Sequence, residues 1–351
     1  MFTLGHRTAG EPHPPLLVAE IGANHDGDVV KAETMVRALA EQGAEAIKFQ
    51  LYTAAELVAD HDRDVTWGPA GRQRTERIGP MFDRLSLPRE AVRDLMALGE
   101  ELGMVSFATP FSEDGVDYLE SVGVPGYKVA ASDVGHLPFL RHLARTGKPV
   151  ILSLGKCTLS EADEAVETLL GEGVASLSLL HCVAEYPAPI DEMNLRAIPL
   201  LQQMYPEAVI GLSDHSLGST AAIAAVALGA GIVEKHVTPS QDDDGPDHWF
   251  SLPIAEVGAL TRALADAHLA LGEPGSARKH VVGGEVAERR TAIRSLILAR
   301  AMSAGERVTA EDVKIVRPGT GLAPRYLDAV VGMALSEDLP ANTPLTWDSF
   351  K

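Results

Sequence analysis

The segment that decides the fold is residues 209–237, which read VIGLSDHSLGSTAAIAAVALGAGIVEKHV. It begins with an apolar run of strand length, Val209 to Ser213, and continues with a helix-patterned stretch, Ser219 to Leu228. A second strand-length run, Ile232 to Val237, closes it. Two strands joined by a helix indicate a parallel pair, because the helix returns the chain to the same edge of the sheet.

The same alternation repeats along the chain before this segment. Eight strand-length apolar runs occur in all: Leu16 to Ile21, Ala46 to Tyr52, Met104 to Phe107, Gly126 to Ala130, Val150 to Leu154, Leu177 to Cys182, Val209 to Ser213 and Ile232 to Val237. Helix-patterned segments lie between most of them: Val29 to Glu41, Glu90 to Leu102, Ser160 to Leu170, Glu192 to Met204 and Ser219 to Leu228.

Eight such units predict an α/β fold closed into a (β/α)8 TIM barrel. An open, doubly wound sheet is the alternative, and it usually carries a glycine-rich phosphate turn after its first strand. The corresponding turn here reads Ile21-Gly-Ala-Asn-His-Asp-Gly27, without the dinucleotide pattern. The barrel is therefore favoured.

The end of the chain has a different pattern. Residues Gly272 to His280 are rich in turn formers, and the short apolar runs after Ala287 are separated by turns. We expect a barrel domain over residues 1–271, a linker over 272–286 and a small β-rich domain over 287–351.

Composition excludes several classes of protein. The 351 residues are 46% hydrophobic and 23% charged, as in an average soluble globular protein. The formal charge of -19 argues against nucleic acid or an anionic membrane as a partner, because no broad basic face is available.

Two cysteines, Cys157 and Cys182, cannot build a disulfide framework and are interpreted as reduced thiols. The N-terminus lacks a signal-sized apolar run, so we expect a cytoplasmic protein.

Polar residues gather where the predicted strands end, and barrel active sites lie at this C-terminal rim. The strand ends carry Glu20, Lys48 with Gln50, Thr109, Lys128, Ser153, His181, Ser213 with His215, and Glu234 with His236. Charged groups inside apolar runs are costly unless they are paired or used. We interpret Glu20, Lys48, Lys128 and Glu234 as functional rather than as a ring of structural ion pairs.

Two histidines at this rim suggest a metal site. His215 and His236 end the last two strands, which are neighbours in a closed barrel. Two imidazoles beside carboxylates suit a divalent metal with open positions, Mn²⁺ first and Co²⁺ or Mg²⁺ as alternatives. A pair of hydrogen-bonded core histidines is the structural alternative.

Lysines and hydroxyls at the rim suggest an anion site. Lys48 and Lys128 with Ser153 and Ser213 would bind a compact anion carrying phosphate and carboxylate. A Schiff-base aldolase also uses a buried strand lysine, and this alternative stays open.

Four other features have weaker signals. The His181–Cys182 pair lies inside an apolar run and is interpreted as core packing, while His25 either binds substrate or caps a turn. The run Asp242 to Asp244 is typical of a solvated turn. Asp247 follows closely after His236, so its carboxylate would return over the barrel mouth.

These motifs together resemble the sialic acid synthase family. They are Ala19-Glu-Ile-Gly-Ala-Asn-His-Asp-Gly27, Ile47-Lys-Phe-Gln50, Tyr127-Lys128, Leu180-His-Cys182 through Tyr186-Pro187, Gly211-Leu-Ser-Asp-His215, Glu234-Lys-His236 and Gly245-Pro-Asp247. The segment Arg317-Pro-Gly-Thr-Gly321 is similar to the signature of the family's C-terminal antifreeze-like (SAF) domain. The resemblance runs from about residue 16 to the end of the chain.

The resemblance implies a transferase that condenses phosphoenolpyruvate with an N-acyl mannosamine-type amino sugar and water, giving a nine-carbon 2-keto acid and phosphate. It also implies a domain-swapped homodimer. Lys48, Lys128, Ser153 and Ser213 would hold phosphoenolpyruvate, and His215 and His236 the metal. Gln50, Tyr186 and Asp247 would contact the sugar, Glu20 would handle a proton or water, and Arg317 would act in trans on the sugar's acyl group.

Three positions depart from the family pattern. Asp133, counted among the catalytic residues, stands where the family tends to carry Glu, Ala184 where it carries Asn, and Leu154 where it carries Thr. These changes shorten one carboxylate and remove hydrogen-bond partners near phosphoenolpyruvate. Two alternatives remain, a related 3-deoxy keto acid synthase with another aldehyde acceptor, and a catalytically retired barrel scaffold. The sequence leaves the acceptor sugar open, whether N-acetylmannosamine or a diacetamido-trideoxy hexose.

Overall fold

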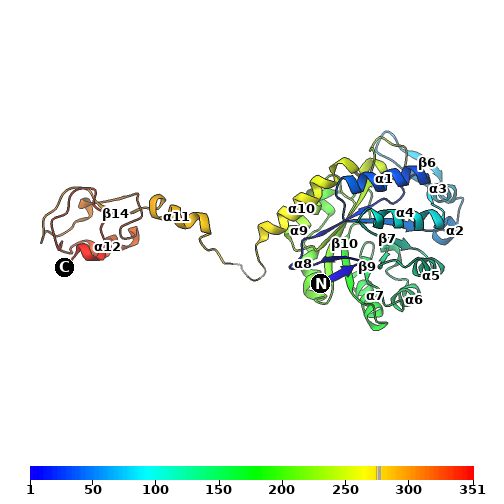
Figure 1. The fold of residues 1–351 in the computed structure, drawn as a ribbon, viewed down its shortest axis with the longest axis horizontal. Coiled ribbons are helices and arrows are strands. Elements are labelled where there is room, and N and C mark those ends of the chain that lie inside the picture. The colour runs from blue at the N-terminus through cyan, green and yellow to red at the C-terminus, as the bar shows by residue number, and fades with distance from the viewer. Residues whose placement is uncertain (274, 276–277) are drawn as a thin grey trace. The chain divides into compact units, whose positions relative to one another are not determined.

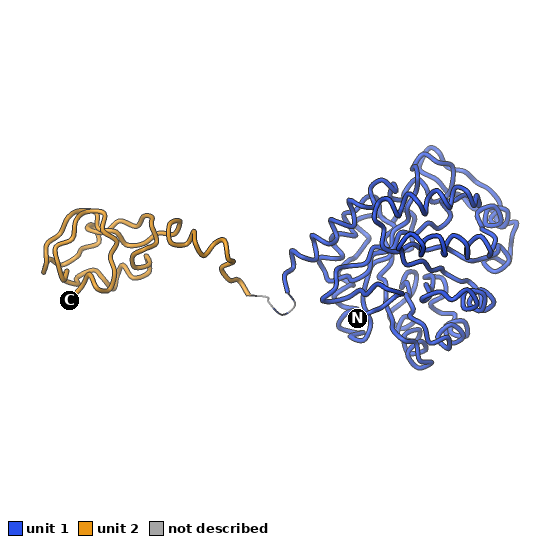
Figure 2. The backbone as a smooth tube through the Cα atoms, in the orientation of Figure 1, with its two compact units in different colours: residues 1–275 blue, residues 276–351 orange. Residues whose placement is uncertain are grey.

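The computed structural model describes residues 1–273, 275 and 278–351, which form two compact units (Figure 2). The first unit is Met1–Gly275 and the second is Ser276–Lys351. The predicted linker includes residues 274, 276 and 277, which lie outside the described residues.

The first unit is a closed parallel barrel with helices around it (Figure 1). Its strands follow one another in chain order, and β12 closes the ring by pairing with both β11 and β3. The eight strands are β3 (Leu16–Glu20), β4 (Ala46–Leu51), β7 (Val105–Pro110), β8 (Tyr127–Val129), β9 (Val150–Ser153), β10 (Leu177–Cys182), β11 (Val209–Asp214) and β12 (Ile232–Thr238). The predicted barrel and all eight of its strands are confirmed.

Helices cover the outside of this barrel. They are α1 (Val29–Glu41), α2 (Ala54–Leu57), α3 (Ile78–Leu85), α4 (Arg89–Glu101), α5 (Glu113–Val122), α6 (Leu137–Ala144), α7 (Leu159–Gly171), α8 (Ala197–Met204), α9 (Thr220–Ala227) and α10 (Val257–Leu271). Four of the five expected helices match within about one residue. The fifth, expected from Glu192, begins at Ala197, because Asn194 has a positive φ of 41° that a helix cannot contain.

An N-terminal hairpin that the sequence pattern did not predict closes one end of the barrel. Strands β1 (Phe2–Leu4) and β2 (Arg7–Ala9) pair antiparallel. Phe2, Leu4 and Ala9 are buried in one cluster with the inward side chains of the barrel strands, which are Leu16, Val18, Ala46, Val105, Phe107, Ile151, Leu180, Val209 and Ile232. Several of these residues begin their strands, so the hairpin seals the amino ends and leaves the carboxyl ends for a site.

A second hairpin is inserted between β4 and α4. Strands β5 (Asp64–Trp67) and β6 (Arg74–Arg77) pair antiparallel and lead into α3. β6 (RTER) is mostly charged and no residue of β5 (DVTW) is fully buried, so the two strands carry little hydrophobic signal. The hairpin follows the carboxyl end of β4 and therefore belongs to the side of the barrel where the strands end.

The second unit is small and built around its own core. It contains α11 (Gly283–Ala292), β14 (Ser295–Leu298), β15 (Val313–Val316) and α12 (Leu327–Val330). The core residues are Leu296, Leu298, Met302, Val308, Leu322, Val330, Leu335, Leu345 and Phe350. Helix α11 begins inside the segment expected to be a linker.

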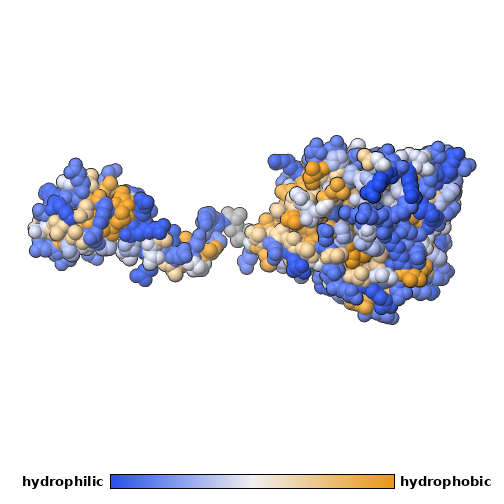
Figure 3. Space-filling view, turned by 90° about the horizontal axis from the view of Figure 1, so that it is seen from above, coloured by the Kyte–Doolittle hydropathy of each residue, from blue (hydrophilic) through white to orange (hydrophobic). Residues whose placement is uncertain are grey.

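The surface agrees with the acidic composition. The face drawn in Figure 3 is largely hydrophilic, with separate hydrophobic patches. Among the helices that the structure describes, none is long and apolar enough to cross a membrane.

We predict that Phe2→Ala destabilises the barrel by about 3–5 kcal/mol, because it removes a ring with no solvent exposure from a packed cluster. Chemical denaturation followed by circular dichroism measures the loss. Leu269→Ala is the control, because Leu269 is 73% exposed and its removal leaves no cavity. Equal unfolding midpoints for the two variants would contradict a sealing role for the hairpin.

Candidate active site

The carboxyl ends of the barrel strands bring charged side chains into one cavity of about 70 Å³. Strand register places Glu20 opposite Lys48, His236 opposite Glu20, and Ser213 opposite Glu234. The lining residues are Glu20, Lys48, Gln50, Thr109, Phe111, Lys128, Ala130, Ala131, Ser153, Cys182, Tyr186, Ser213, His215, Glu234 and His236. We call this cavity the rim site.

Glu234 is the central anion of the rim site. Its Oε2 lies 3.6 Å from Lys48 Nζ and its Oε1 lies 3.8 Å from Lys128 Nζ. The same Oε1 accepts a hydrogen bond from Ser213 Oγ at 3.2 Å. Burial alone would raise the pKa of Glu234, but the two ammonium groups hold it below its ordinary value. The side chain is therefore an ionised carboxylate between two lysines.

Lys48 has the densest set of partners. Its Nζ lies 2.9 Å from Glu20 Oε2 and donates to Thr109 Oγ1 at 3.1 Å. Burial alone would lower the pKa of Lys48, but the charges of Glu20 and Glu234 reverse this and raise it. Lys48 therefore stays a cation, which a Schiff-base lysine cannot be when it attacks a carbonyl.

Lys128 is held differently. Its Nζ donates to Ser153 Oγ at 2.7 Å and to the carbonyl of Val129 at 2.9 Å. Burial lowers the pKa of Lys128 in spite of the attraction of Glu234. A bound anion would restore the charge that burial disfavours, so this lysine suits a phosphate or carboxylate ligand.

Glu20 bridges the anion pocket and the neighbouring amide. It accepts from Gln50 Nε2 at 2.8 Å through Oε1, while Oε2 faces Lys48. Burial, with the charge of Glu234 acting in the same direction, raises its pKa. A raised pKa makes this carboxyl group a better proton acceptor than an ordinary glutamate.

The two histidines lie side by side in the same cavity, with ring centroids 5.5 Å apart. His215 Nδ1 donates to the carbonyl of Val183 at 2.9 Å, which leaves Nε2 as its acceptor nitrogen. Burial lowers the pKa of His215. Burial also lowers the pKa of His236 well below its ordinary value, and repulsion from a protonated His215 would act in the same direction. Both rings are therefore neutral.

Neutral imidazoles in this arrangement fit a divalent metal. His236 Nδ1 is buried, has no hydrogen-bond partner within the described structure, and lies 3.5 Å from Asp247 Oδ2. A carbonyl partner on the second nitrogen, as His215 has, is the usual support of a metal-binding histidine. The described residues contain no group of three or more His, Cys, Asp or Glu side chains arranged for a metal. Two protein nitrogens thus leave most coordination positions to water or substrate.

The turn beside Glu20 and His236 requires a glycine at position 22. Its φ is +53°, and a Cβ added there would lie 3.1 Å from His236 Nδ1 and 3.3 Å from Glu20 Oε1. A side chain at this position would be both strained and in contact with the two functional groups. The turn after β3 therefore lets the backbone approach the site closely.

Aromatic side chains form the outer wall. The Tyr186 ring lies 4.2 Å from that of His215 and 5.5 Å from that of Phe250, measured between centroids. Asp247 adds a carboxyl group next to His236, and burial together with the charge of Glu20 raises its pKa to about 7. This side of the cavity combines apolar surface with hydrogen-bonding groups, as a sugar site does.

The acidic run before Asp247 is paired rather than simply solvated. Asp243 Oδ2 lies 2.7 Å from Lys31 Nζ, Asp242 Oδ1 lies 3.7 Å from an Arg72 nitrogen, and Asp244 pairs with Arg74. The expected solvated turn is confirmed, since Asp242 and Asp244 are exposed, but its carboxylates are also paired. The loop that carries Asp247 is attached to α1 and to the β5–β6 hairpin.

The sequence-predicted site residues divide into two groups. Nine of them line the rim site: Glu20, Lys48, Gln50, Lys128, Ser153, Tyr186, Ser213, His215 and His236. Asp247 lies next to this cavity, 3.5 Å from His236. Asp133 follows β8 in a short 3-10 helix, is half-buried, and is absent from the cavity lining. Arg317 is exposed and belongs to the second unit.

Glu234 was expected to be functional, but its position between the two lysines was not predicted. The signal was present, because Glu234 is a charge inside an apolar strand run. Phe111, Ala130 and Ala131 also line the cavity, and no polar pattern could have revealed them. Cys182 is buried as expected but lines the cavity too, with Sγ 3.8 Å from His215 Nδ1.

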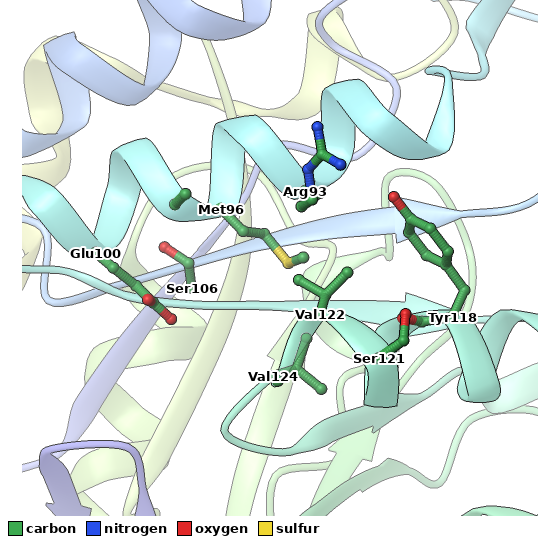
Figure 4. Close-up of a pocket in the computed structure, with 10 residues that line it drawn as sticks. Arg93, Met96, Glu100, Ser106, Tyr118, Ser121, Val122 and Val124 are labelled. Carbon is green, nitrogen blue, oxygen red and sulfur yellow. The ribbon is translucent and has the colours of Figure 1, made fainter.

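A separate cavity of about 350 Å³ lies between α4 and α5 (Figure 4). Arg93, Met96, Tyr118 and Val122 line it from these helices, and Ser106 lines it from β7. Its walls come mainly from the outer helices rather than from strand ends. It is roomier than the rim site, but active sites of barrel enzymes lie at the strand ends.

Fold and site together define a barrel enzyme with a buried anion pocket beside a histidine pair. A family model described as the NeuB family matches residues 35–276, and a SAF domain model matches residues 293–351. The chain belongs to the NeuB family.

Relatives and solved structures agree with this assignment. The chain is 34% identical to N,N'-diacetyllegionaminic acid synthase of Legionella pneumophila, over 98% of this chain and 97% of that protein. It is 32% identical to pseudaminic acid synthase of Helicobacter pylori, over 96% and 98% of the two chains. A crystal structure of N-acetylneuraminic acid synthetase from Leptospira borgpetersenii superposes with a TM-score of 0.73 at 31% identity, covering 82% of this chain and 95% of that one.

His25 gives the protein a testable pH dependence. Its Nδ1 accepts a hydrogen bond from the Gly27 backbone N–H at 3.0 Å. Of the two roles considered for His25, substrate binding and turn capping, the structure therefore shows turn capping. Burial lowers its pKa to about 4. The unfolded chain therefore binds this proton more tightly, so stability is complete above about pH 6.5 and falls as the pH drops to about 4.

We predict that this loss amounts to about 3 kcal/mol and that His25→Asn abolishes most of it, because an amide oxygen can replace Nδ1 as acceptor without titrating. Urea unfolding at pH 7 and pH 4.5 measures the difference. His280→Asn, at an exposed position, is the control. An unchanged pH dependence in His25→Asn would show that other groups cause it.

Proposed function

We propose that this chain is a nonulosonate synthase, a transferase that joins phosphoenolpyruvate to an N-acyl mannosamine-type amino sugar. The observation that carries the proposal is the placement of Lys48, Lys128 and Glu234 in one buried cavity with His215 and His236. The relatives named for legionaminic and pseudaminic acid synthesis support the same reaction class.

The lysine side of the rim site would bind phosphoenolpyruvate. Lys48 and Lys128 supply positive charge, and the hydroxyls of Ser153 and Ser213 supply neutral donors. Glu234 holds the two ammonium groups in place between turnovers. Because the ligand brings its own negative charge, binding would complete the neutralisation of both lysines.

The histidine side would hold the metal and the aldehyde. A divalent metal on His215 and His236, Mn²⁺ by preference, would polarise the aldehyde oxygen when bound. Gln50, Tyr186 and Asp247 would contact the sugar. Tyr186 and Phe250 pack on one side of the histidine rings, and a sugar bound against them would exclude water there and strengthen the electrostatic interactions.

The reaction then balances as follows. C3 of phosphoenolpyruvate attacks the aldehyde carbon, and the aldehyde oxygen takes up a proton. Water adds at C2 and loses one proton to a carboxylate such as Glu20. The C–O bond between C2 and the phosphate then breaks, the C2 hydroxyl gives its remaining proton to the departing phosphate, and C2 becomes the keto carbon. Gln50 orients the Glu20 carboxyl group through its amide hydrogen bond.

Ala184, one of the three departures from the family pattern, would shape the pocket further. The methyl group of Ala184 lies near Gly155 and Ala131, since a Cβ on Gly155 would come within 3.1 Å of both methyl carbons. This small apolar wall offers no hydrogen bond to phosphoenolpyruvate. We expect weaker binding of phosphoenolpyruvate than an amide at position 184 would give. The enzyme would act in the cytoplasm, where phosphoenolpyruvate is made.

The direct test measures phosphate release from phosphoenolpyruvate with N-acetylmannosamine and with diacetamido-trideoxy hexoses, and identifies products by mass. We predict that one sugar gives a nine-carbon keto acid, that chelation stops the reaction, and that Mn²⁺ restores it without refolding. Full activity of the chelated enzyme would refute the metal. Failure with every sugar would refute the acceptor class.

The SAF unit would act in trans within a homodimer, with Arg317 contacting the acyl group of a sugar in the partner's barrel. A guanidinium fork suits a carbonyl oxygen, and Arg317 is exposed on its own unit. This part of the proposal rests on the resemblance to the sialic acid synthase family.

Mixing two inactive variants tests the trans arrangement. We predict that His236→Ala and Arg317→Ala are each nearly inactive, and that co-expressing them restores activity, because one barrel of each heterodimer then has both groups intact. A mixture that stays inactive means that Arg317 acts on its own barrel. A fully active Arg317→Ala variant removes its catalytic role.

A further inference from the structure

A buried ion pair lies directly behind the two histidines. Asp214 and Lys235 face each other across β11 and β12 in the strand register, and Lys235 Nζ donates to Asp214 Oδ2 at 2.8 Å. Both residues are almost completely buried, at 1% and 2% exposure. They alternate along their strands with Ser213, His215, Glu234 and His236, which line the rim site. The pair therefore lies on the opposite face of the strands and cannot reach substrate.

Ser216 completes the network. Its backbone N–H and its hydroxyl both donate to Asp214 Oδ1, at 2.9 and 2.6 Å. Its carbonyl accepts from Lys235 Nζ at 2.8 Å. Asp214 and Ser216, which flank His215, are thus both hydrogen-bonded to Lys235, which precedes His236.

We propose that Asp214 and Lys235 are positioning residues that set the distance and orientation between the imidazoles of His215 and His236. This inference rests on the proposed function, because it assigns the pair to the metal site. The network ties the end of β11 and the first residues beyond it to β12, where backbone pairing alone ends at Asp214 and Lys235. Beyond that point His215 is held by its Nδ1 hydrogen bond to the Val183 carbonyl and by its own carbonyl, which accepts from the Ala188 N–H. Neither bond connects His215 to β12, the strand that carries His236.

General energetics favour this role over a contribution to stability. A buried ion pair is often no more stabilising than apolar side chains of the same size, because both charges lose their hydration. Breaking one partner is costly, since it leaves an unpaired buried charge. The arrangement is therefore better explained by the geometry that it imposes than by a gain in folding free energy.

The test uses the double variant Asp214→Asn/Lys235→Met in the full chain. The amide keeps an oxygen for the Ser216 donors, the thioether keeps the apolar length of the lysine, and no charge is left unpaired. The control is Glu120→Gln/Lys148→Met, which removes a 2.9 Å ion pair from the outer layer of the same barrel. Both variants change charge equally.

Two measurements without substrate report on the histidine pair. These are Mn²⁺ affinity by titration calorimetry and the visible absorption bands of the Co²⁺ form. We expect the Asp214/Lys235 variant to melt near the wild-type temperature, to bind Mn²⁺ roughly tenfold more weakly, and to shift the Co²⁺ bands. The control should match the wild type in all three.

Wild-type affinity and spectrum in the folded Asp214/Lys235 variant would overturn the inference. If that variant does not fold, Lys235→Arg decides by the same measurements, because it keeps the charge but changes the donor geometry. An unchanged affinity and spectrum in Lys235→Arg would also overturn it. If the wild type itself binds neither ion, the metal part of the proposed function fails, and the positioning role fails with it.

Discussion

The carboxylate of Glu234, buried between Lys48 and Lys128, is the constraint on which the site depends. Unpaired, any of these three groups would cost several kcal/mol to bury. With Glu20 added, the cavity contains two cations and two carboxyl groups, one with a raised pKa. Such a site is ready for a compact anion, because the ligand replaces interactions that the protein has already arranged.

The rest of the barrel serves this arrangement. The hairpin of β1 and β2 seals the amino ends of the strands with Phe2 and Leu4, so the charges can lie at the carboxyl ends over an apolar core. Strand register brings Glu20, Lys48 and His236 next to one another although they are far apart in the sequence. On the outer face of the same strands, the Asp214–Lys235 pair joins the segments that carry the histidines. Each contribution comes from a different part of the chain.

Much of this was predictable from the sequence, and the failures have physical causes. The eight strands and most site residues follow from apolar runs that end in polar groups, since buried parallel strands are apolar on both faces. The β5–β6 hairpin was not predicted because β6 is mostly charged and β5 is short and only partly buried. Helix α8 was expected too early because the left-handed turn at Asn194 has no periodic signal. Glu234 was expected to be functional, but its position between the two lysines was not predicted, because it depends on distances to two lysines on other strands. The pairing of Asp242, Asp243 and Asp244 was missed for the same reason.

The account is tested most directly by anomalous diffraction from crystals of the full chain grown with Mn²⁺ and phosphoenolpyruvate. It predicts one manganese peak at bonding distance from a ring nitrogen of each of His215 and His236, with the phosphoenolpyruvate phosphate against Lys48 and Lys128. A covalent adduct on either lysine would contradict it. So would manganese bound elsewhere in the barrel while the rim site stays free of phosphoenolpyruvate.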